Sequence, residues 1–190
     1  MSIILATYPR SGQHFLREQI KQRLDIKDFH HTHETLKKID SKIITIARNP
    51  IDSICSWVAM EDYYYKNVDI EKVTKKAKIK YNIYYKYLLK NADIVIDYNF
   101  LNSNINEIIN DLSIFLNIKQ INNIFYNSIA NEVDKKHLIS SKENNNYNNI
   151  YKILSHISFT NEDLLYKELL NKSPNLKYNC LNTESDIIKL

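Results

Sequence analysis

The chain has 190 residues, of which 44% are hydrophobic, and this length and composition suit one globular domain over residues 1–190. Its net charge of +4 and pI of about 8.8 suit an anionic ligand but are too mild to indicate a nucleic-acid-binding protein. It has two cysteines, no apolar run near the roughly 20 residues of a membrane span and no basic leader, so we expect a reduced, cytoplasmic protein without a membrane span.

Strands and helices are predicted to alternate along the chain. Runs of strand length occupy residues 3–6, 26–33, 42–47 and 93–97, and apolar residues recur at helical spacing over residues 15–24, 50–60, 70–91 and 105–116. Further helices are predicted over residues 121–130 and 161–171, and Asp69 and Thr160 are predicted to cap the helices that follow them. Residues 61–67 are predicted to form a loop, and residues 135–149 a loop that suits a lid. This order predicts an α/β fold with three layers and a central, mostly parallel sheet.

The segment TYPRSGQHF, residues 7–15, joins the first predicted strand to the first helix and contains the one glycine of the chain, Gly12. Glycine permits a tight turn with positive φ, and the backbone N–H groups of such a turn and of the following helix bind anions. Arg10 adds a guanidinium group that matches phosphate or sulfate oxygens. Gln13 and His14 stand where a Walker A loop has lysine and serine or threonine, so the segment predicts an anion site without that motif. The alternative is an ordinary turn that carries an exposed arginine.

A second anion site is predicted where the strand over residues 42–47 ends. Arg48 follows this strand directly, and the carboxyl ends of strands are where open α/β sheets bind ligands. Pro50 suits the first turn of a helix, and Ser56 on that helix supplies a hydroxyl donor that complements the fork of Arg48. Alternatives are a surface salt bridge for Arg48 and a solvated position for Ser56. Two anion sites at strand ends predict one ligand with two anionic ends.

The second predicted strand carries a group of histidines. Its period of two places His31 and His33 on one face and His30 on the other. A neutral His33 near an anionic ligand has a suitable pKa for a general base. The same pair also suits a zinc hydrolase, which would need a third ligand. The distant histidines that could supply this ligand are His137 and His156.

Taken together, these motifs and their order along the chain resemble those of the sulfotransferases that use 3′-phosphoadenosine-5′-phosphosulfate. Residues 7–12, TYPRSG, resemble the 5′-phosphosulfate loop of that family, and residues 47–52, ARNPID, with Ser56 resemble its 3′-phosphate motif. Residues 31–33, HTH, are similar to the Lys-Thr-His of the cytosolic enzymes, and residues 97–101, DYNFL, to the segment whose tyrosine contacts the adenine. The resemblance covers residues 3 to about 116 of a chain that is shorter than typical members.

The resemblance implies a P-loop-like strand–loop–helix, as in sulfotransferases and nucleotide kinases, and the transfer of a sulfonate group to an acceptor hydroxyl. His33 is implied to be the catalytic base and Arg10 to stabilise the charge on the leaving group, with no metal required. Glu34 is the second candidate for the base, since some sulfotransferases that act on carbohydrates are similar in using a glutamate. Residues implied to bind the donor are Arg10, Ser11, Gly12, Gln13, His14, Arg48, Ser56 and Tyr98. His31 is implied to bind the substrate. The implied partners are the nucleotide donor, whose product is 3′-phosphoadenosine-5′-phosphate, and a hydroxyl acceptor, with no nucleic acid.

Several positions depart from the family pattern. Arg10 replaces the lysine of the cytosolic enzymes but resembles tyrosylprotein sulfotransferases, and Gln13 and His14 replace threonines. His31 replaces a lysine. The Arg-Lys-Gly that closes on the 3′-phosphate is absent, and the candidates to replace it are Lys135, Lys136, Lys142 and Lys152.

Because this clamp is missing, a second hypothesis is a catalytically inactive nucleotide-binding or partner-binding module of the same fold. The aromatic run Tyr63–Tyr65 lies in a predicted loop and suits either stacking on an acceptor ring or a homodimer contact. The tyrosines at positions 81, 84, 85 and 87 are instead typical of packing within a helical layer.

Overall fold

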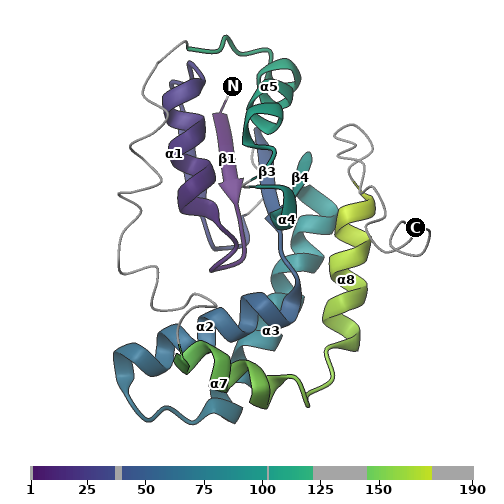
Figure 1. Cartoon of the computed structure of the whole chain (residues 1–190). Coiled ribbons are helices and arrows are strands. Elements are labelled where there is room, and N and C mark those ends of the chain that lie inside the picture. The colour runs from purple at the N-terminus through teal and green to yellow at the C-terminus, as the bar shows by residue number, and fades with distance from the viewer. Residues whose placement is uncertain (1, 37–39, 102, 122–144, 173–190) are drawn as a thin grey trace, which may run out of the picture.

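The structure, a computed structural model, describes residues 2–36, 40–101, 103–121 and 145–172 (Figure 1). Within these ranges the chain forms four strands and seven helices. In chain order they are β1 Ser2–Ala6, α1 Gln13–Arg23, β2 Phe29–Thr32, β3 Ser41–Ala47, α2 Pro50–Tyr65, α3 Ile70–Asn91, β4 Ile94–Asp97, α4 Tyr98–Leu101, α5 Ile105–Leu116, α7 Asn145–Leu154 and α8 Thr160–Asn171. None of the described helices is long and apolar enough to span a membrane.

The four strands form one sheet in the order β2-β1-β3-β4, and every pair is parallel. Leu5 of β1 pairs with His31 of β2 on one side and with Ile44 of β3 on the other. Because all strands run in one direction, their carboxyl ends meet at a single edge. The chain leaves β1 toward β2 and then crosses back to β3, so a topological switch point lies between β1 and β3. The predicted parallel sheet is confirmed.

Helices cover both faces of the sheet, which gives the three predicted layers. Alternate strand residues such as Ile3, Leu5 and Ile44 form one core with α1 and α5. Their neighbours Ile4 and Ile43 form the other core with α2, α3, α7 and α8. In Figure 1, α2 and α7 lie beside each other below the strands, and α8 lies along α3. Strands β1, β3 and β4 are mostly buried on both faces, as expected for a parallel sheet, whereas the edge strand β2 is partly exposed.

The helix after β3 is longer than its sequence pattern predicts. It begins at Pro50, where Asn49 Oδ1 accepts a hydrogen bond from the backbone N–H of Ile51. It continues to Tyr65, so the predicted loop over residues 61–67 is wrong for residues 61–65. Asp62 contacts α7 through Asn146, at 3.0 Å, and this docking stabilises the last turns. The run Tyr63–Tyr65 is therefore helical, and its side chains are 52–72% exposed.

The boundaries of α3, α7 and α8 test the helix caps and the loop that the sequence predicts. Asp69 caps α3 by accepting a hydrogen bond from the backbone N–H of Lys72 at 2.9 Å, as predicted. Thr160 is not a cap but the first residue of α8, after Phe159, and no side chain caps that helix. Residues 145–149 belong to α7 and not to a loop, because Tyr147 is buried against α2. The rest of the predicted lid lies outside the described residues. Of the predicted helix over residues 121–130, the structure describes Ile121 alone, which is not helical.

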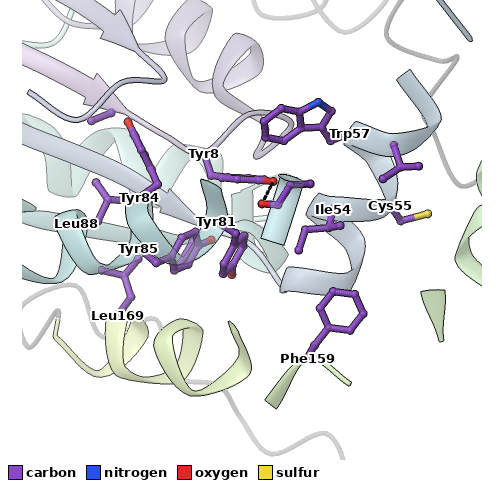
Figure 2. Close-up of a cluster of buried hydrophobic side chains, with 14 of the residues drawn as sticks. Tyr8, Ile54, Cys55, Trp57, Tyr81, Tyr84, Tyr85, Leu88, Phe159 and Leu169 are labelled. Carbon is purple, nitrogen blue, oxygen red and sulfur yellow. Dashed lines mark hydrogen bonds between the residues drawn. The ribbon is translucent and has the colours of Figure 1, made fainter. Parts of the chain in front are cut away.

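Tyrosine side chains form the centre of the core beneath the strand ends (Figure 2). The ring of Tyr8 packs edge-on against Tyr81 at 4.9 Å between centroids, and Tyr81 stacks on Tyr85 at 3.8 Å. The hydroxyl of Tyr8 donates to the carbonyl of Ala77 at 3.1 Å. These contacts fix the start of the loop after β1 to α3. The predicted packing role is confirmed for Tyr81, Tyr84 and Tyr85, which are buried.

Candidate functional site

The carboxyl end of each strand is followed by a residue that the sequence predicts to be functional. Arg10 lies in the loop after β1, His33 directly follows β2, Arg48 follows β3 and Tyr98 follows β4. Since β1 lies between β2 and β3 in the sheet, the loop after β1 has His33 on one side and Arg48 on the other. The predicted residues therefore gather at one edge of the sheet, around the switch point.

The loop after β1 is closely packed against α4. Gly12 has a φ of 79°, and a Cβ atom built on it would lie 2.8 Å from Leu101 Cδ2 and 2.9 Å from Tyr98 Cε2. A side chain at this position would therefore clash as well as strain the backbone. Arg10 also has positive φ, 68°, which is uncommon for a residue other than glycine. The loop after β1 thus has two residues with positive φ, Arg10 and Gly12.

The two predicted anion sites come together as one. Arg48 Nη1 donates a hydrogen bond to the carbonyl of Arg10, and Arg10 Nε donates to Ser56 Oγ at 3.3 Å. The guanidinium of Arg48 also lies over the ring of Tyr98, 4.3 Å from its centroid. Burial and the nearby charge of Arg48 lower the pKa of Arg10. An anion bound beside these two guanidinium groups would offset the repulsion that acts on Arg10.

Two buried polar atoms at this edge have no hydrogen-bond partner among the described residues: Ser11 Oγ and Arg48 Nε. Buried polar groups in folded proteins are nearly always paired, so such atoms call for an explanation. Both are able to donate to an oxygen of a bound anion. Ser11 and Arg48 therefore fit the phosphate or sulfate groups of a ligand.

The backbone of Arg48 is fixed by two tyrosines of α3. Its N–H donates to Tyr85 Oη at 2.9 Å, and its carbonyl accepts from Tyr85 at 3.0 Å and from Tyr81 at 2.9 Å. Both tyrosines are fully buried. Arg48 thus leaves β3 in a defined direction, although nothing in the sequence near Arg48 indicates these partners.

Replacing Tyr85 by phenylalanine is expected to destabilise the fold by about 1–3 kcal/mol, because the buried N–H of Arg48 loses its acceptor. Tyr81→Phe is the matched control, since the carbonyl of Arg48 keeps its bond from Tyr85 when Tyr81 is changed. The loss of stability, measured by urea unfolding, should be clearly larger for Tyr85→Phe. Equal losses would contradict the assigned role of the Tyr85 hydroxyl.

His33 takes part in a closed set of hydrogen bonds with Thr7 and Gln13. Nδ1 of His33 donates to the carbonyl of Thr7 at 2.8 Å, and Gln13 Nε2 donates to His33 Nε2 at 2.6 Å. The hydroxyl of Thr7 donates to Gln13 Oε1 at 2.9 Å, which completes the set. Burial lowers the pKa of His33, and the nearby charges of Lys80 and Arg10 lower it further. The imidazole is therefore neutral near pH 7, as a general base must be.

The other histidines lie apart from this set. His31 is mostly exposed on the edge strand β2. Its partial burial and the charges of Arg17 and Lys21 lower its pKa. His14 lies partly exposed in the first turn of α1, and His156 is exposed between α7 and α8. In the part of the chain that the structure describes, no three His, Cys, Asp or Glu side chains are grouped to hold a metal ion. His137 lies outside the described residues.

Of the four lysines predicted to replace the missing clamp, the structure describes one. Lys152 is exposed on α7, and Lys135, Lys136 and Lys142 lie outside the described residues. Sequence reasoning also missed Lys80 of α3, whose charge acts on His33 and whose ammonium lies 4.9 Å from the centre of the Trp57 ring. A charged residue within a long amphipathic helix gives no local sign of such a neighbour.

A groove of about 970 Å³ lies elsewhere, between α3 and the connection from α7 to α8. Its floor includes the buried carboxylate of Glu162, which accepts from Asn82 Nδ2 at 2.5 Å and pairs with Lys78 at 3.4 Å. None of the residues that the sequence predicts to be functional line it. The groove is therefore separate from the edge where the arginines and His33 gather.

No family model matches this chain, and no match is found among curated proteins. Function is therefore inferred from the residues at the carboxyl edge of the sheet.

Proposed function

We propose that the chain is a sulfotransferase that moves a sulfonate group from 3′-phosphoadenosine-5′-phosphosulfate to an acceptor hydroxyl. The observation that carries this proposal is the convergence of Arg10, Arg48 and Ser56 beside the Gly12 turn at the switch point of a parallel sheet. A ligand with two anionic ends fits a site with two guanidinium groups and two buried donors that lack described partners. Open α/β sheets bind nucleotides at such an edge.

The residues present suggest how the donor would be held. The loop over residues 10–12 and the first turn of α1 are a P-loop-like anion cradle for the 5′-phosphosulfate, with Ser11, Gln13 and His14 in or beside it. Arg48 and Ser56 suit the 3′-phosphate, and the bond from Arg10 to Ser56 joins the two halves of the site. Tyr98 stacks on Arg48, which places its ring beside the proposed 3′-phosphate site, where it suits a contact with the adenine.

Transfer requires a base on the acceptor side and stabilised charge on the leaving side. The acceptor oxygen would lose its proton to His33 Nε2 while it forms a bond to sulfur, and the bond from sulfur to the bridging oxygen would break. The electron pair of that bond would stay on the 5′-phosphate of the departing nucleotide. Arg10 and the loop N–H groups would stabilise this charge without reorganising, which together with positioning supplies most of the rate enhancement.

Replacing His33 by alanine is expected to lower sulfonate transfer about 10²- to 10⁴-fold, the usual contribution of a positioned base. Binding of 3′-phosphoadenosine-5′-phosphate should change little, because His33 has no assigned contact with the nucleotide. Transfer is measured as nucleotide release with phenols, alcohols, sugars and tyrosine peptides as acceptors. His30→Ala is the matched control, since His30 is exposed and pairs with Asp28. Transfer by His33→Ala at the parental rate would overturn the assigned base.

The rate of transfer should keep its full value to lower pH than an ordinary histidine allows. Burial lowers the pKa of His33 from 6.5, and only the neutral imidazole accepts a proton. The acid limb of kcat/KM is therefore expected below pH 6.5, with the rate rising as pH increases through it. A pH–rate profile measures this, and an acid limb above pH 6.5 would be the contrary result.

The second candidate is a nucleotide-binding module of the same fold without turnover. It is favoured by one contact, the 2.6 Å bond from Gln13 Nε2 to His33 Nε2, because this bond occupies the lone pair that a base needs. Tight nucleotide binding without transfer to any acceptor class would support this candidate over the enzyme.

A further inference from the structure

The side chain of Gln13 lies between the predicted base and the strand that carries the anion loop. Gln13 is the first residue of α1 and is 5% exposed, and His33 follows the edge strand β2. Both hydrogen-bonding ends of the Gln13 amide are used within the protein, one by Thr7 and one by His33. Gln13 therefore belongs to the environment of the base as well as to the loop predicted to bind the donor.

The chemistry of the three groups decides the direction of each bond. The carbonyl of Thr7 can only accept, so Nδ1 of His33 carries a proton. A neutral imidazole then has a lone pair on Nε2, which accepts from the amide nitrogen of Gln13. The amide oxygen is left to accept from the hydroxyl of Thr7. All three bonds are satisfied at once in this arrangement.

Reversing the amide would require a charged imidazole. The amide oxygen of Gln13 would then face His33 Nε2. Nε2 would have to carry a proton in addition to the one on Nδ1, and the hydroxyl of Thr7 would have to accept a hydrogen bond from the amide nitrogen. The titratable groups that act on His33 are His31 from β2, Arg10 from the loop and Lys80 from α3, and each disfavours the imidazolium. The neutral arrangement is therefore the one that suits these surroundings.

We propose that Gln13 is a positioning residue that holds His33 as the neutral tautomer protonated on Nδ1 and covers Nε2 until an acceptor hydroxyl takes the place of its amide. This inference rests on the proposed sulfotransferase function. The incoming hydroxyl would donate to Nε2 as the amide did, so the tautomer of His33 is unchanged by the exchange. While covered, Nε2 cannot activate water, which protects the donor from hydrolysis in the absence of acceptor.

The tautomer and pKa of His33 are read from long-range ¹H–¹⁵N correlation spectra of the intact protein and two variants. Gln13→Met removes both hydrogen bonds at similar volume, and Gln13→Glu places a carboxylate opposite Nε2. Loss of a donor that favours the neutral imidazole should raise the pKa of His33 by about half to one unit in Gln13→Met. The rise should be larger in Gln13→Glu, because the carboxylate stabilises the imidazolium.

Gln22→Met, at a partly exposed position of α1, is the matched control and should leave His33 unchanged. A parental His33 protonated on Nε2, or a pKa that falls or stays constant in both Gln13 variants, would overturn the proposal. If Gln13→Met does not fold, the shift in Gln13→Glu alone decides, since that side chain has nearly the shape of glutamine.

Two activity measurements separate this inference from the proposed function. In Gln13→Met, Nε2 is uncovered, so hydrolysis of the donor in the absence of acceptor should increase. The acid limb of the transfer rate should move to higher pH by the same amount as the pKa of His33 in the spectra. Parental hydrolysis and an unmoved acid limb, in a variant that still transfers sulfonate, would refute the role of Gln13 and leave the enzyme assignment intact. Failure of the parent protein to bind the nucleotide would refute the proposed function, whatever the spectra show.

Discussion

Replacing Arg48 by alanine is expected to weaken the binding of 3′-phosphoadenosine-5′-phosphate about 10- to 150-fold. This range follows from the roughly 1.5–3 kcal/mol of a hydrogen bond to a charged group. Arg48 is largely buried, its Nε has no described partner, and its Nη1 is held by the carbonyl of Arg10. The side chain is thus oriented before the ligand arrives, so little of the interaction is lost to ordering.

Calorimetric titration measures the effect, and adenosine 5′-phosphate is the control ligand because it lacks the 3′-phosphate. Its affinity should fall less than that of 3′-phosphoadenosine-5′-phosphate in Arg48→Ala, because adenosine 5′-phosphate has no 3′-phosphate contact to lose. Arg17→Ala is the control variant, since Arg17 lies on α1 and pairs with Glu18 at 2.8 Å. Arg48→Lys should recover only part of the affinity, because lysine keeps the charge but loses the planar fork. Parental affinity in Arg48→Ala would contradict the assigned 3′-phosphate site.

Replacing Gly12 by alanine is expected to destabilise the protein by about 2–5 kcal/mol and to abolish nucleotide binding. The left-handed backbone costs a residue with a Cβ about 1–2 kcal/mol, and overpacking adds about 1–3 kcal/mol. The added methyl group would lie 2.8 Å from Leu101 Cδ2 and 2.9 Å from Tyr98 Cε2. Relief of this clash would displace the buried side chain of Leu101 and the ring of Tyr98, and Tyr98 belongs to the proposed site.

Asn117→Ala gives a comparison at a left-handed position without a clash. Asn117 ends α5 with a φ of 52°, is exposed and already has a Cβ atom, so alanine there is expected to cost less than the full backbone term of about 1–2 kcal/mol. Thermal or urea unfolding compares the two variants. A loss in Gly12→Ala no larger than that in Asn117→Ala would show that the loop has room for a side chain.

The parts of the fold that follow from local signals could be predicted from the sequence. Strands β1, β3 and β4 could be read from their apolar runs, and α3 from its periodicity and the cap at Asp69. The end of α2 and the start of α7 could not, because their residues are polar or aromatic and are helical through mutual docking. The bond from Asn146 to Asp62 and the burial of Tyr147 are contacts between segments far apart in the chain.

The candidate site also has parts that could be predicted from the sequence and parts that could not. The position of Arg10 in a loop after one strand and of Arg48 after another could be predicted from the sequence. The contact between Arg10 and Arg48 depends on the strand order, because β1 and β3 are neighbours in the sheet although β2 lies between them in the chain. The contact between Gln13 and His33 joins residues 20 positions apart on different elements, and no local pattern marks it.

The most direct test of the account is calorimetric titration of the intact parent protein with 3′-phosphoadenosine-5′-phosphate and, separately, with adenosine 5′-phosphate. The account predicts one site for each chain and an affinity for the first nucleotide at least about tenfold higher than for the second, the difference made by one additional charged hydrogen bond. Equal affinities, or no binding of either nucleotide, would contradict the claim that this sheet edge is a site for a ligand with two anionic ends.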